Sequence, residues 1–343
     1  MKILHIMAGK GQGGAETYST DVMLSLHKSG IDQTIVMSSE APRYEEMKKA
    51  GLRLRTAPLA LPIRPLQKML LKNLIAREKP HIIHCWMRRA ASLLPTRHDA
   101  KAVIGWFGGY YDPKHFGGCE HFVGVTPDIV KHMRDNGVDP THAHYIPTFP
   151  DIETLPPVDR NALATPKDTK VFLTLSRLHP KKGLDTFLKA LAQIPDAYAW
   201  LAGDGPLRNE LEQLAKAEGV MDRVRFLGWR TDRAALLRAA DVCVLPSRYE
   251  PFGTVILEAW AAGTPFVACK SAGPAATVED DVNGLLVEID DIAGLANAMR
   301  RATRDEELRR RMVAQGYTAY IKSFTREAVT RQWIQFYQGL IRA

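Results

Sequence analysis

The sequence predicts an α/β protein made of two similar halves, each built on a parallel sheet, with a ligand site in the cleft between them. The length of 343 residues favours two domains over one. Short apolar runs alternate with helical patterns along the chain, which is typical of parallel sheets. A proline-rich stretch with little apolar content, residues 147–167, separates two sets of runs. Ligands of such sheets bind outside the carboxyl ends of the strands.

The apolar runs predict six strands in each half. In the first half we expect strands near residues 2–8, 33–38, 81–86, 102–107, 121–125 and 144–147. In the second half we expect them near residues 170–175, 198–202, 224–228, 241–246, 265–268 and 285–287. We therefore expect a first domain over residues 1–160, a second over residues 161–325, and a terminal helix over residues 326–343.

Helix signals agree with this division. Thr126 before Pro127 is typical of an N-cap followed by proline at the first helical position. Pro206 is expected to open a helix that Gly219 ends. Residues 326–341 carry an apolar stripe on one face, which predicts an amphipathic helix.

Composition narrows the class of protein. The four cysteines are widely spaced, with no Cys-x-x-Cys pair, which favours reduced thiols over disulfides or a zinc site. The sequence contains no run of 18 apolar residues, and residues 1–6 resemble a strand rather than a signal peptide. We therefore expect a cytoplasmic protein.

The net charge of +8 is unevenly distributed. Residues 48–101 contain thirteen Lys and Arg but only two acids, so the rest of the chain is slightly acidic. A basic face of this kind attracts nucleic acid, anionic lipid or a phosphorylated substrate, or is simply solvated. Composition alone leaves these alternatives open.

A glycine-rich segment, residues 9–16, follows the first expected strand. Gly13 and Gly14 would let backbone amides approach a phosphate closely. The segment also fits the G-x-G-x-x-G pattern of dinucleotide sites, but that pattern requires an acidic residue near the end of the second strand. The strand ends at Ser38 and Ser39, and Glu40 comes late. A nicotinamide-dependent oxidoreductase is therefore disfavoured, and a tight turn without a ligand remains an alternative.

Three segments of the second half supply candidate ligand groups. Arg177 and Lys182 follow its first strand and could bind phosphate, and Gly203 lies in a tight turn after the next strand. Glu250 and Glu258 flank a Pro-Phe-Gly turn before an apolar helix. Their eight-residue separation corresponds to roughly 12 Å along a helix, about the length of a nucleotide sugar. A glycoside hydrolase would need its carboxyl groups about 5–9.5 Å apart.

No Asp-x-Asp triplet and no His/Cys cluster with metal spacing occurs in the sequence. We therefore expect no metal and no other cofactor. A diphosphate leaving group would be neutralised by Arg177, Lys182 and helix termini instead.

Together, the segments at residues 13–16, 176–183, 203–206 and 250–258 resemble those of the family 4 glycosyltransferases. The likeness covers nearly the whole chain. It implies the GT-B fold, two Rossmann-like domains facing across a cleft, and retaining transfer of a hexose-type sugar from a nucleoside diphosphate sugar. In this family the terminal helix crosses back onto the first domain.

The resemblance also implies roles for individual residues. Arg177 and Lys182 would hold the diphosphate, Glu250 the hydroxyls of the transferred sugar, and Glu258 the ribose. Backbone amides of Phe252, Gly253 and Thr254 would face sugar and phosphate, and Gly14 would approach the diphosphate from the first domain. Two positions depart from the family pattern: Gly108 stands where a sugar-contacting His is usual, and Ala276 where Glu is common. His84, His115 or His121 would be spatial substitutes, although a single His is more often structural.

Residues 64–79 combine leucines with Lys68, Lys72, Arg77 and Lys79, a pattern that suits an anionic membrane surface or core packing equally. Family members that build lipopolysaccharide core or lipid-linked glycans work at the inner membrane surface. We therefore expect a peripheral enzyme with a cell-envelope acceptor and no nucleic-acid partner. A nucleotide-sugar-binding protein of the same fold with weak or lost turnover is the alternative.

Overall fold

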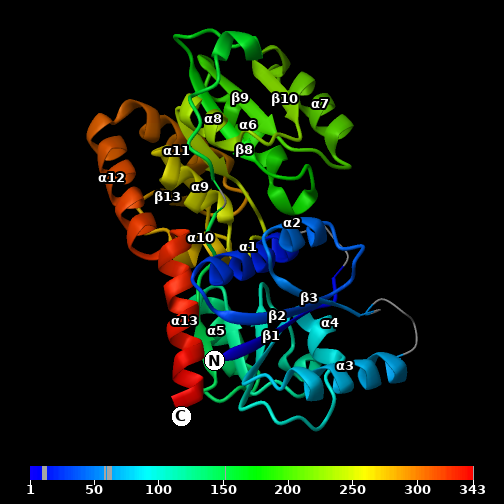
Figure 1. Cartoon of the computed structure of the whole chain (residues 1–343). Helices are drawn as coiled ribbons and strands as arrows, with labels where there is room; N and C mark the ends of the chain where they lie inside the picture. The colour runs from blue at the N-terminus through cyan, green and yellow to red at the C-terminus, as the bar shows by residue number, and fades with distance from the viewer. Residues whose placement is uncertain (10–13, 58, 60–63, 151, 343) are drawn as a thin grey trace. The chain divides into compact units, whose positions relative to one another are not determined.

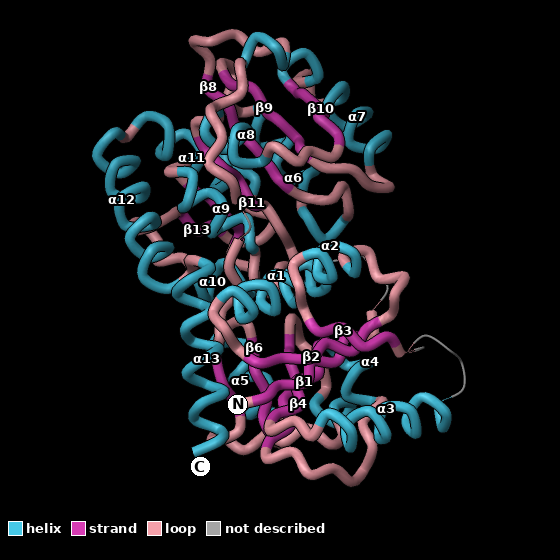
Figure 2. The backbone as a smooth tube through the Cα atoms, in the orientation of Figure 1, coloured by secondary structure: helices cyan, strands magenta, loops and turns pink. Residues whose placement is uncertain are grey.

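A computed structural model describes the chain except for residues 10–13, 58, 60–63, 151 and 343 (Figure 1). The backbone contacts divide it into two compact units, which we call unit 1 (Met1–Phe149 and Arg326–Ala343) and unit 2 (Pro150–Thr325). Each unit contains one parallel sheet with helices around it, as the sequence predicts (Figure 2). Among the described helices, none combines the length and the apolar content needed to span a lipid bilayer.

The sheet of unit 1 has seven parallel strands in the order β3-β2-β1-β4-β5-β6-β7. Six of them confirm the expected strands. The seventh, β3, was missed because its sequence Arg-Leu-Arg-Thr offers no apolar run; it is an edge strand without a buried side chain. The strands are β1 (Lys2–Met7), β2 (Asp32–Met37), β3 (Arg53–Thr56), β4 (Ile82–Trp86), β5 (Ala102–Phe107), β6 (His121–Gly124) and β7 (Ala143–Tyr145).

One helix of unit 1 begins where its capping signal predicts. The hydroxyl oxygen of Thr126 accepts a hydrogen bond from the Ile129 amide at 3.1 Å, which confirms the predicted N-cap. The helices are α1 (Gly14–Lys28), α2 (Tyr44–Lys49), α3 (Arg64–Glu78), α4 (Met87–Ser92), α5 (Pro127–Asp135) and α13 (Arg326–Arg342), with a short 3-10 turn η1 (Pro113–Phe116).

The terminal helix α13 packs inside unit 1, beside α1. Its Trp333 and Tyr337 are fully buried. The Trp333 indole donates a hydrogen bond to the Tyr18 hydroxyl at 3.1 Å, and the Tyr337 hydroxyl lies 2.8 Å from Nδ1 of His84. His84 is thus fixed inside the core, so the structure gives it a structural role rather than that of a sugar-contacting substitute.

The sheet of unit 2 has six parallel strands in the order β10-β9-β8-β11-β12-β13, and all six were expected. The chain order runs outward from β8 in both directions, so the topology switches between β8 and its neighbour β11. The strands are β8 (Lys170–Leu175), β9 (Ala197–Ala202), β10 (Val224–Gly228), β11 (Val242–Leu245), β12 (Phe266–Cys269) and β13 (Leu285–Val287).

Helices on unit 2 bury an aliphatic core against this sheet. The helix expected to open at Pro206 begins two residues later, at Arg208. The helices are α6 (Leu184–Ala192), α7 (Arg208–Ala217), α8 (Arg233–Ala239), α9 (Thr254–Ala262), α10 (Ala272–Thr277), α11 (Ile292–Arg304) and α12 (Glu306–Ser323), with 3-10 turns η2 (Arg160–Leu163), η3 (Pro180–Lys182) and η4 (Met221–Arg223).

The contacts assign residues 150–160 to unit 2, whereas the sequence placed them in the first domain. The reason is local hydrogen bonding. The Val158 amide donates to the Ala235 carbonyl at 3.1 Å, and the Arg160 guanidinium pairs with Asp241 at 2.8 Å. The proline-rich stretch therefore lies along unit 2 for much of its length. All four cysteines are free thiols, as expected.

Candidate functional site

The candidate residues of unit 2 follow neighbouring strands of its sheet. Arg177 and Lys182 come after β8, Gly203 after β9, and Glu250 after β11. Because the carboxyl ends of parallel strands meet at one edge, these loops gather beside the switch between β8 and β11. That is the place where open α/β sheets bind their ligands. The topology thus brings together segments that are more than 60 residues apart in sequence.

Backbone hydrogen bonds join the loop after β8 to the loop after β11. The carbonyl of Lys181 accepts from the amides of Arg248 at 2.9 Å and Tyr249 at 3.2 Å. The Lys181 ammonium also lies 4.6 Å from the centre of the Tyr249 ring, a cation–π contact. These contacts fix the position of the residues that follow, including Glu250.

The guanidinium of Arg248 strengthens the same junction. It contacts carboxylate oxygens of Asp185 at 2.7 Å and Asp290 at 2.8 Å. Hydrogen bonds to Asp185 and then Asp290 raise the pKa of Arg248, and the hydrogen bonds from Arg248 lower the pKa of Asp290. Sequence analysis did not single out Arg248. Its two acidic partners lie 63 and 42 residues away, so no local pattern reveals the contact.

The ammonium of Lys182 pairs directly with the carboxylate of Glu250. Their Nζ and Oε2 atoms are 2.5 Å apart, and both side chains are mostly shielded, with 17% and 15% of their surface exposed. The Glu250 carbonyl also accepts a hydrogen bond from the Gly273 amide at 2.7 Å. Two residues predicted to have separate roles therefore lie in contact. A phosphate could displace Glu250 from Lys182, and a sugar hydroxyl could displace Lys182 from Glu250.

Glu258 lies on α9 and is almost fully buried, with 1% of its surface exposed. Its Oε1 atom is 2.5 Å from Nη1 of Arg233, the first residue of α8. A buried carboxylate needs such a partner because desolvation of an isolated charge is costly. Sequence analysis missed Arg233; a buried acid on an apolar helix is the signal that could have prompted a search for a cation.

The N-terminus of α9 is shaped by Gly253, which has a left-handed backbone with φ of 85°. The N-cap residue Gly253 has no side chain that could cap this helix. The Ile256 amide donates to the Gly253 carbonyl at 2.9 Å, so an anion would be bound by the amides that precede Ile256. Phe252 is buried before the turn, and Thr254 is exposed at the first helical position. At Gly203 a Cβ atom would lie only 1.9 Å from the Ser176 carbonyl oxygen, so the turns after β8 and β9 approach too closely for any other residue.

Three further predicted residues are Arg177, Gly14 and Gly13. Arg177 is exposed and forms no ion pair with any carboxylate that the structure describes. Gly14 is the exposed first residue of α1 and belongs to unit 1. Gly13 lies outside the described residues.

The structure explains one departure from the family pattern. A Cβ atom on Gly108 would lie 2.4 Å from Cη2 of Trp106, so the indole of Trp106 fills the space beside position 108. Trp106 is 2% exposed and stacks on Tyr18, with 5.6 Å between ring centres. A histidine at position 108 would require this indole to move. Ala276, the other departure, is exposed on α10.

Within the described residues, no group of three or more His, Cys, Asp or Glu side chains is placed to hold a metal ion. The charged groups at the carboxyl edge of unit 2 are cations and single carboxylates held in ion pairs. This arrangement can hold an anion between a lysine and an uncapped helix N-terminus. It can also present a carboxylate to hydroxyl groups.

Two family models match the chain. The model for glycosyl transferases group 1 matches residues 157–319, and the model for glycosyltransferase family 4 matches residues 12–154. Among curated proteins, two lipopolysaccharide core biosynthesis glycosyltransferases of Rhizobium meliloti are similar along their whole length. LpsE is 36% identical and LpsD 32% identical, each over 98% of this chain and 98% of the relative.

Solved structures show the same fold across the whole chain. Anabaena HepE in complex with UDP and glucose matches with a TM-score of 0.81 at 21% identity, over 98% of this chain and 99% of that chain. A glycosyltransferase from Rickettsia africae matches with a TM-score of 0.88 at 18% identity, over 99% and 98% of the two chains. The architecture of both units is thus that of GT-B proteins.

Proposed function

Because this chain belongs to the family 4 glycosyltransferases, we propose that it transfers a hexose-type sugar, with retention, from a nucleoside diphosphate sugar to a cell-envelope glycan. The acceptor is a hydroxyl group of lipopolysaccharide core or of a lipid-linked saccharide. Two relatives matched along their full length are named for lipopolysaccharide core biosynthesis, and a GT-B protein of similar fold was solved with UDP and glucose. The observation that carries the proposal is the Lys182–Glu250 pair beside the uncapped N-terminus of α9.

Each group at this edge has a proposed task. On donor binding, Lys182 exchanges the Glu250 carboxylate for the diphosphate, and Arg177 supplies the second cation. Glu250 is then free to accept hydrogen bonds from sugar hydroxyls, and Glu258 accepts from the ribose. The amides of Phe252, Gly253 and Thr254 face sugar and phosphate, and Gly203 lets the turns after β8 and β9 lie close together. Cations and helix amides take the place of a metal ion.

The reaction proceeds on the face of the sugar from which the diphosphate leaves. The bond between the anomeric carbon and the phosphate oxygen breaks, and the acceptor hydroxyl oxygen bonds to the same carbon. The hydroxyl proton passes to the departing phosphate oxygen. Lys182 and Arg177 stabilise the negative charge that develops on the diphosphate, and the remaining residues hold the reactants in position.

A binding screen followed by a turnover assay tests this proposal. Thermal unfolding is measured with UDP, GDP and ADP side by side, and the nucleotide that stabilises the protein identifies the donor base. The matching nucleotide sugar is then incubated with the protein, with and without deacylated lipopolysaccharide. We expect acceptor-dependent release of the nucleoside diphosphate. No stabilisation by any of the three nucleotides would contradict the proposal.

The alternative is a nucleotide-sugar-binding protein with weak or lost turnover, and the Trp106 indole beside Gly108 favours it. Such a protein would be stabilised by a nucleoside diphosphate but would release none from the sugar donor. The two measurements above therefore separate the alternatives.

We also propose that the enzyme works in the cytoplasm, docked at the inner face of the cell membrane. The support is the charge of α3, because its Leu71 and Ile75 are buried inside unit 1. Lys72, Arg77 and Lys79 remain exposed and can approach anionic headgroups. In vesicle sedimentation at low salt we expect a preference for phosphatidylglycerol over phosphatidylcholine, reduced in the Lys72→Gln/Arg77→Gln variant. Equal sedimentation with both lipids would refute membrane docking.

A further inference from the structure

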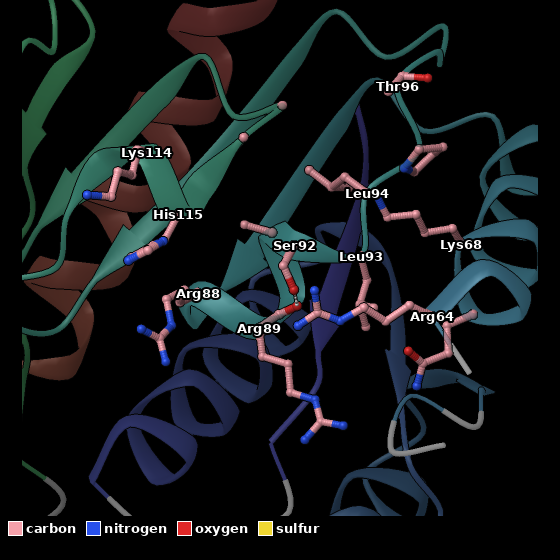
Figure 3. Close-up of a pocket in the computed structure, with 15 residues that line it drawn as sticks. Arg64, Lys68, Arg88, Arg89, Ser92, Leu93, Leu94, Thr96, Lys114 and His115 are labelled. Carbon is pink, nitrogen blue, oxygen red and sulfur yellow. Dashed lines mark hydrogen bonds between the residues drawn. The ribbon is translucent and has the colours of Figure 1, made fainter. Parts of the chain in front are cut away.

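Unit 1 contains a cavity of about 980 Å³ between α3, α4 and the segment around η1 (Figure 3). We call it the basic cavity. Among the described residues that line it, the charged side chains are all basic and none is Asp or Glu. Arg64 and Lys68 come from α3, Arg88 and Arg89 from α4, and Lys114 and His115 from η1. The three segments thus bring cations from different parts of the sequence around one hollow.

Within the described part of the chain, the cavity cations of α3 and α4 have no acidic partners. Arg64, Lys68, Arg88 and Arg89 are exposed, and none forms an ion pair with a carboxylate in the part of the chain that the structure describes. Some other basic residues of unit 1 do have acidic partners: Lys2 and Arg55 both contact the Glu78 carboxylate, at 2.9 and 2.8 Å. Like charges around a hollow raise the local positive potential, which an incoming anion relieves.

Two of these cations, Arg88 and Arg89, lie at the carboxyl end of β4. Met87, the residue between β4 and Arg88, has a left-handed backbone with φ of 67°, which is unfavourable for a side chain of this size. Such strain is concentrated at functional sites. Nη2 of Arg89 donates to the Leu59 carbonyl at 3.0 Å, which holds the guanidinium near the cavity. Ser92 donates to the Arg89 carbonyl at 2.8 Å within α4.

The lining chemistry matches an acidic saccharide. Guanidinium groups bind phosphate and carboxylate through paired hydrogen bonds, and lysine adds a point charge. Ser92 and Thr96 add hydroxyl groups that can bond to sugar hydroxyls. The volume lies at the upper end of the about 300–1,000 Å³ of typical small-molecule sites, which suits more than one sugar ring. Apart from His115, none of the described residues that line the cavity is aromatic, so they offer no platform for stacked bases.

We propose that the basic cavity binds phosphate or carboxylate groups of the acceptor saccharide, and so selects acidic glycans as substrates. This inference rests on the proposed function, since it names the class of acceptor for the same transfer. Lipid headgroups carry the same phosphate chemistry. However, the lining leucines, Leu93 and Leu94, are buried, and a hollow admits an oligosaccharide more readily than a membrane surface. We therefore assign the cavity to the saccharide.

The test compares two variants with equal loss of charge. Lys68→Gln/Arg88→Gln removes two cations of the basic cavity. Lys48→Gln/Lys49→Gln removes two exposed lysines at the end of α2, outside the cavity. Binding of deacylated lipopolysaccharide oligosaccharide, intact or dephosphorylated with hydrofluoric acid, is measured by calorimetry. Phosphatidylglycerol vesicles and inorganic phosphate are titrated in parallel.

We expect the cavity variant to bind the intact oligosaccharide about tenfold or more weakly than the wild type, because charged contacts to an anion are lost. The control variant should change binding less than about twofold, because its lysines act only through the screened long-range field. With turnover, the acceptor KM should rise in the cavity variant while the KM for the nucleotide sugar stays the same.

Equal oligosaccharide affinity in the two variants would overturn the proposal. So would a loss confined to vesicle binding, which would assign the cavity to lipid headgroups. The calorimetric comparison requires no turnover, so a failure of glycosyl transfer would leave the cavity result interpretable. Conversely, if the cavity variant transfers sugar with an unchanged acceptor KM, the acceptor role of the basic cavity is refuted and the proposed transferase activity stands.

Discussion

The candidate site of unit 2 and the α3 and α4 side of the basic cavity in unit 1 differ in whether their cations have acidic partners. At the carboxyl edge of unit 2, Lys182 pairs with Glu250 and Arg233 with Glu258. In the basic cavity of unit 1, Arg64, Lys68 and Arg88 have no acidic partner in the described chain. Paired charges are positioned in advance and are partly shielded from salt, whereas unpaired exposed cations act through a field that salt screens. The paired charges of unit 2 suit precise positioning of a ligand, whereas the unpaired cations of the basic cavity suit long-range attraction of an anion.

Replacing Glu250 by Gln removes one of the paired charges of unit 2, and we expect it to have the largest effect. The substitution keeps the shape but removes the charge that positions Lys182 and accepts from sugar hydroxyls. We expect kcat to fall about 100-fold, in the range found for losses of preorganised charged contacts. The fall in kcat is measured as the rate of nucleotide release at a saturating concentration of the sugar donor. Glu288→Gln, which removes the exposed partner of Lys270, is the control and should retain full turnover.

Replacing Arg233 by Ala tests whether pairing in unit 2 also stabilises the fold. The Glu258 side chain is 2% exposed, but that of Arg233 is 42% exposed, so part of the cost of a broken buried pair is screened. We expect a loss of about 2 kcal/mol in the free energy of unfolding. Urea unfolding measures it. Arg310→Ala, which breaks the exposed pair with Glu306, should change stability by less than about 0.5 kcal/mol; equal losses in both variants would contradict the argument.

Histidines make the stability of unit 1 sensitive to acid. Burial lowers the pKa of His5 from 6.5 to about 3, and burial also lowers the pKa of His144 to about 4. The unfolded chain therefore binds more protons than the folded chain below pH 6.5, and stability falls as the pH drops through this window toward 3. We expect a loss of about 2 kcal/mol between pH 7 and pH 5 from the fully buried His5, with a smaller, solvent-screened contribution from the partly exposed His144.

Urea unfolding at pH 7, 6 and 5 measures this pH dependence. Carboxylates with lowered pKa, such as Glu78 at about 2, lose their contribution at lower pH, starting near the ordinary carboxylate range. The change in stability above pH 5 therefore reports mainly on protonation of histidines. A flat stability profile there would show that the imidazoles are not held neutral.

The smallest expected effect concerns the contact between Gly108 and Trp106. Gly108→Ala places a methyl group against the indole, and we expect a loss of about 1 kcal/mol, typical of overpacking. The double variant Gly108→Ala/Trp106→Phe removes the opposing ring edge and should cost less than the sum of its parts. Thermal unfolding of the two single variants and the double variant completes the cycle. Additive effects would mean that the indole is not what keeps position 108 small.

Much of the fold was predictable because apolar runs mark buried strands. The runs at β1, β4 and β5 identify the centre of the unit 1 sheet directly. β3 escaped because an edge strand needs no apolar run when its side chains stay partly exposed. The boundary expected at residue 160 differs from the division by contacts, which begins unit 2 at Pro150. Composition does not reveal the hydrogen bond from Val158 to Ala235, because it joins segments far apart in sequence.

The site was predictable as a set of residues but not as a set of contacts. Local motifs named Lys182, Glu250 and Glu258, because each lies in a short loop or helix start with a recognisable pattern. Their partners depend on the order of strands in the sheet, so the Lys182–Glu250 pair and the role of Arg233 needed the structure. The basic cavity shows the same limit: the excess of charge was visible, but its gathering around one hollow was not.

The path of the chain through the two units has a consequence for biosynthesis. Unit 2 is continuous in sequence, from Pro150 to Thr325, whereas unit 1 is completed only by α13. During translation, unit 2 can close its core while Tyr18 and His84 still await Trp333 and Tyr337. A nascent or truncated chain lacking α13 would expose this aromatic surface to chaperones and proteases.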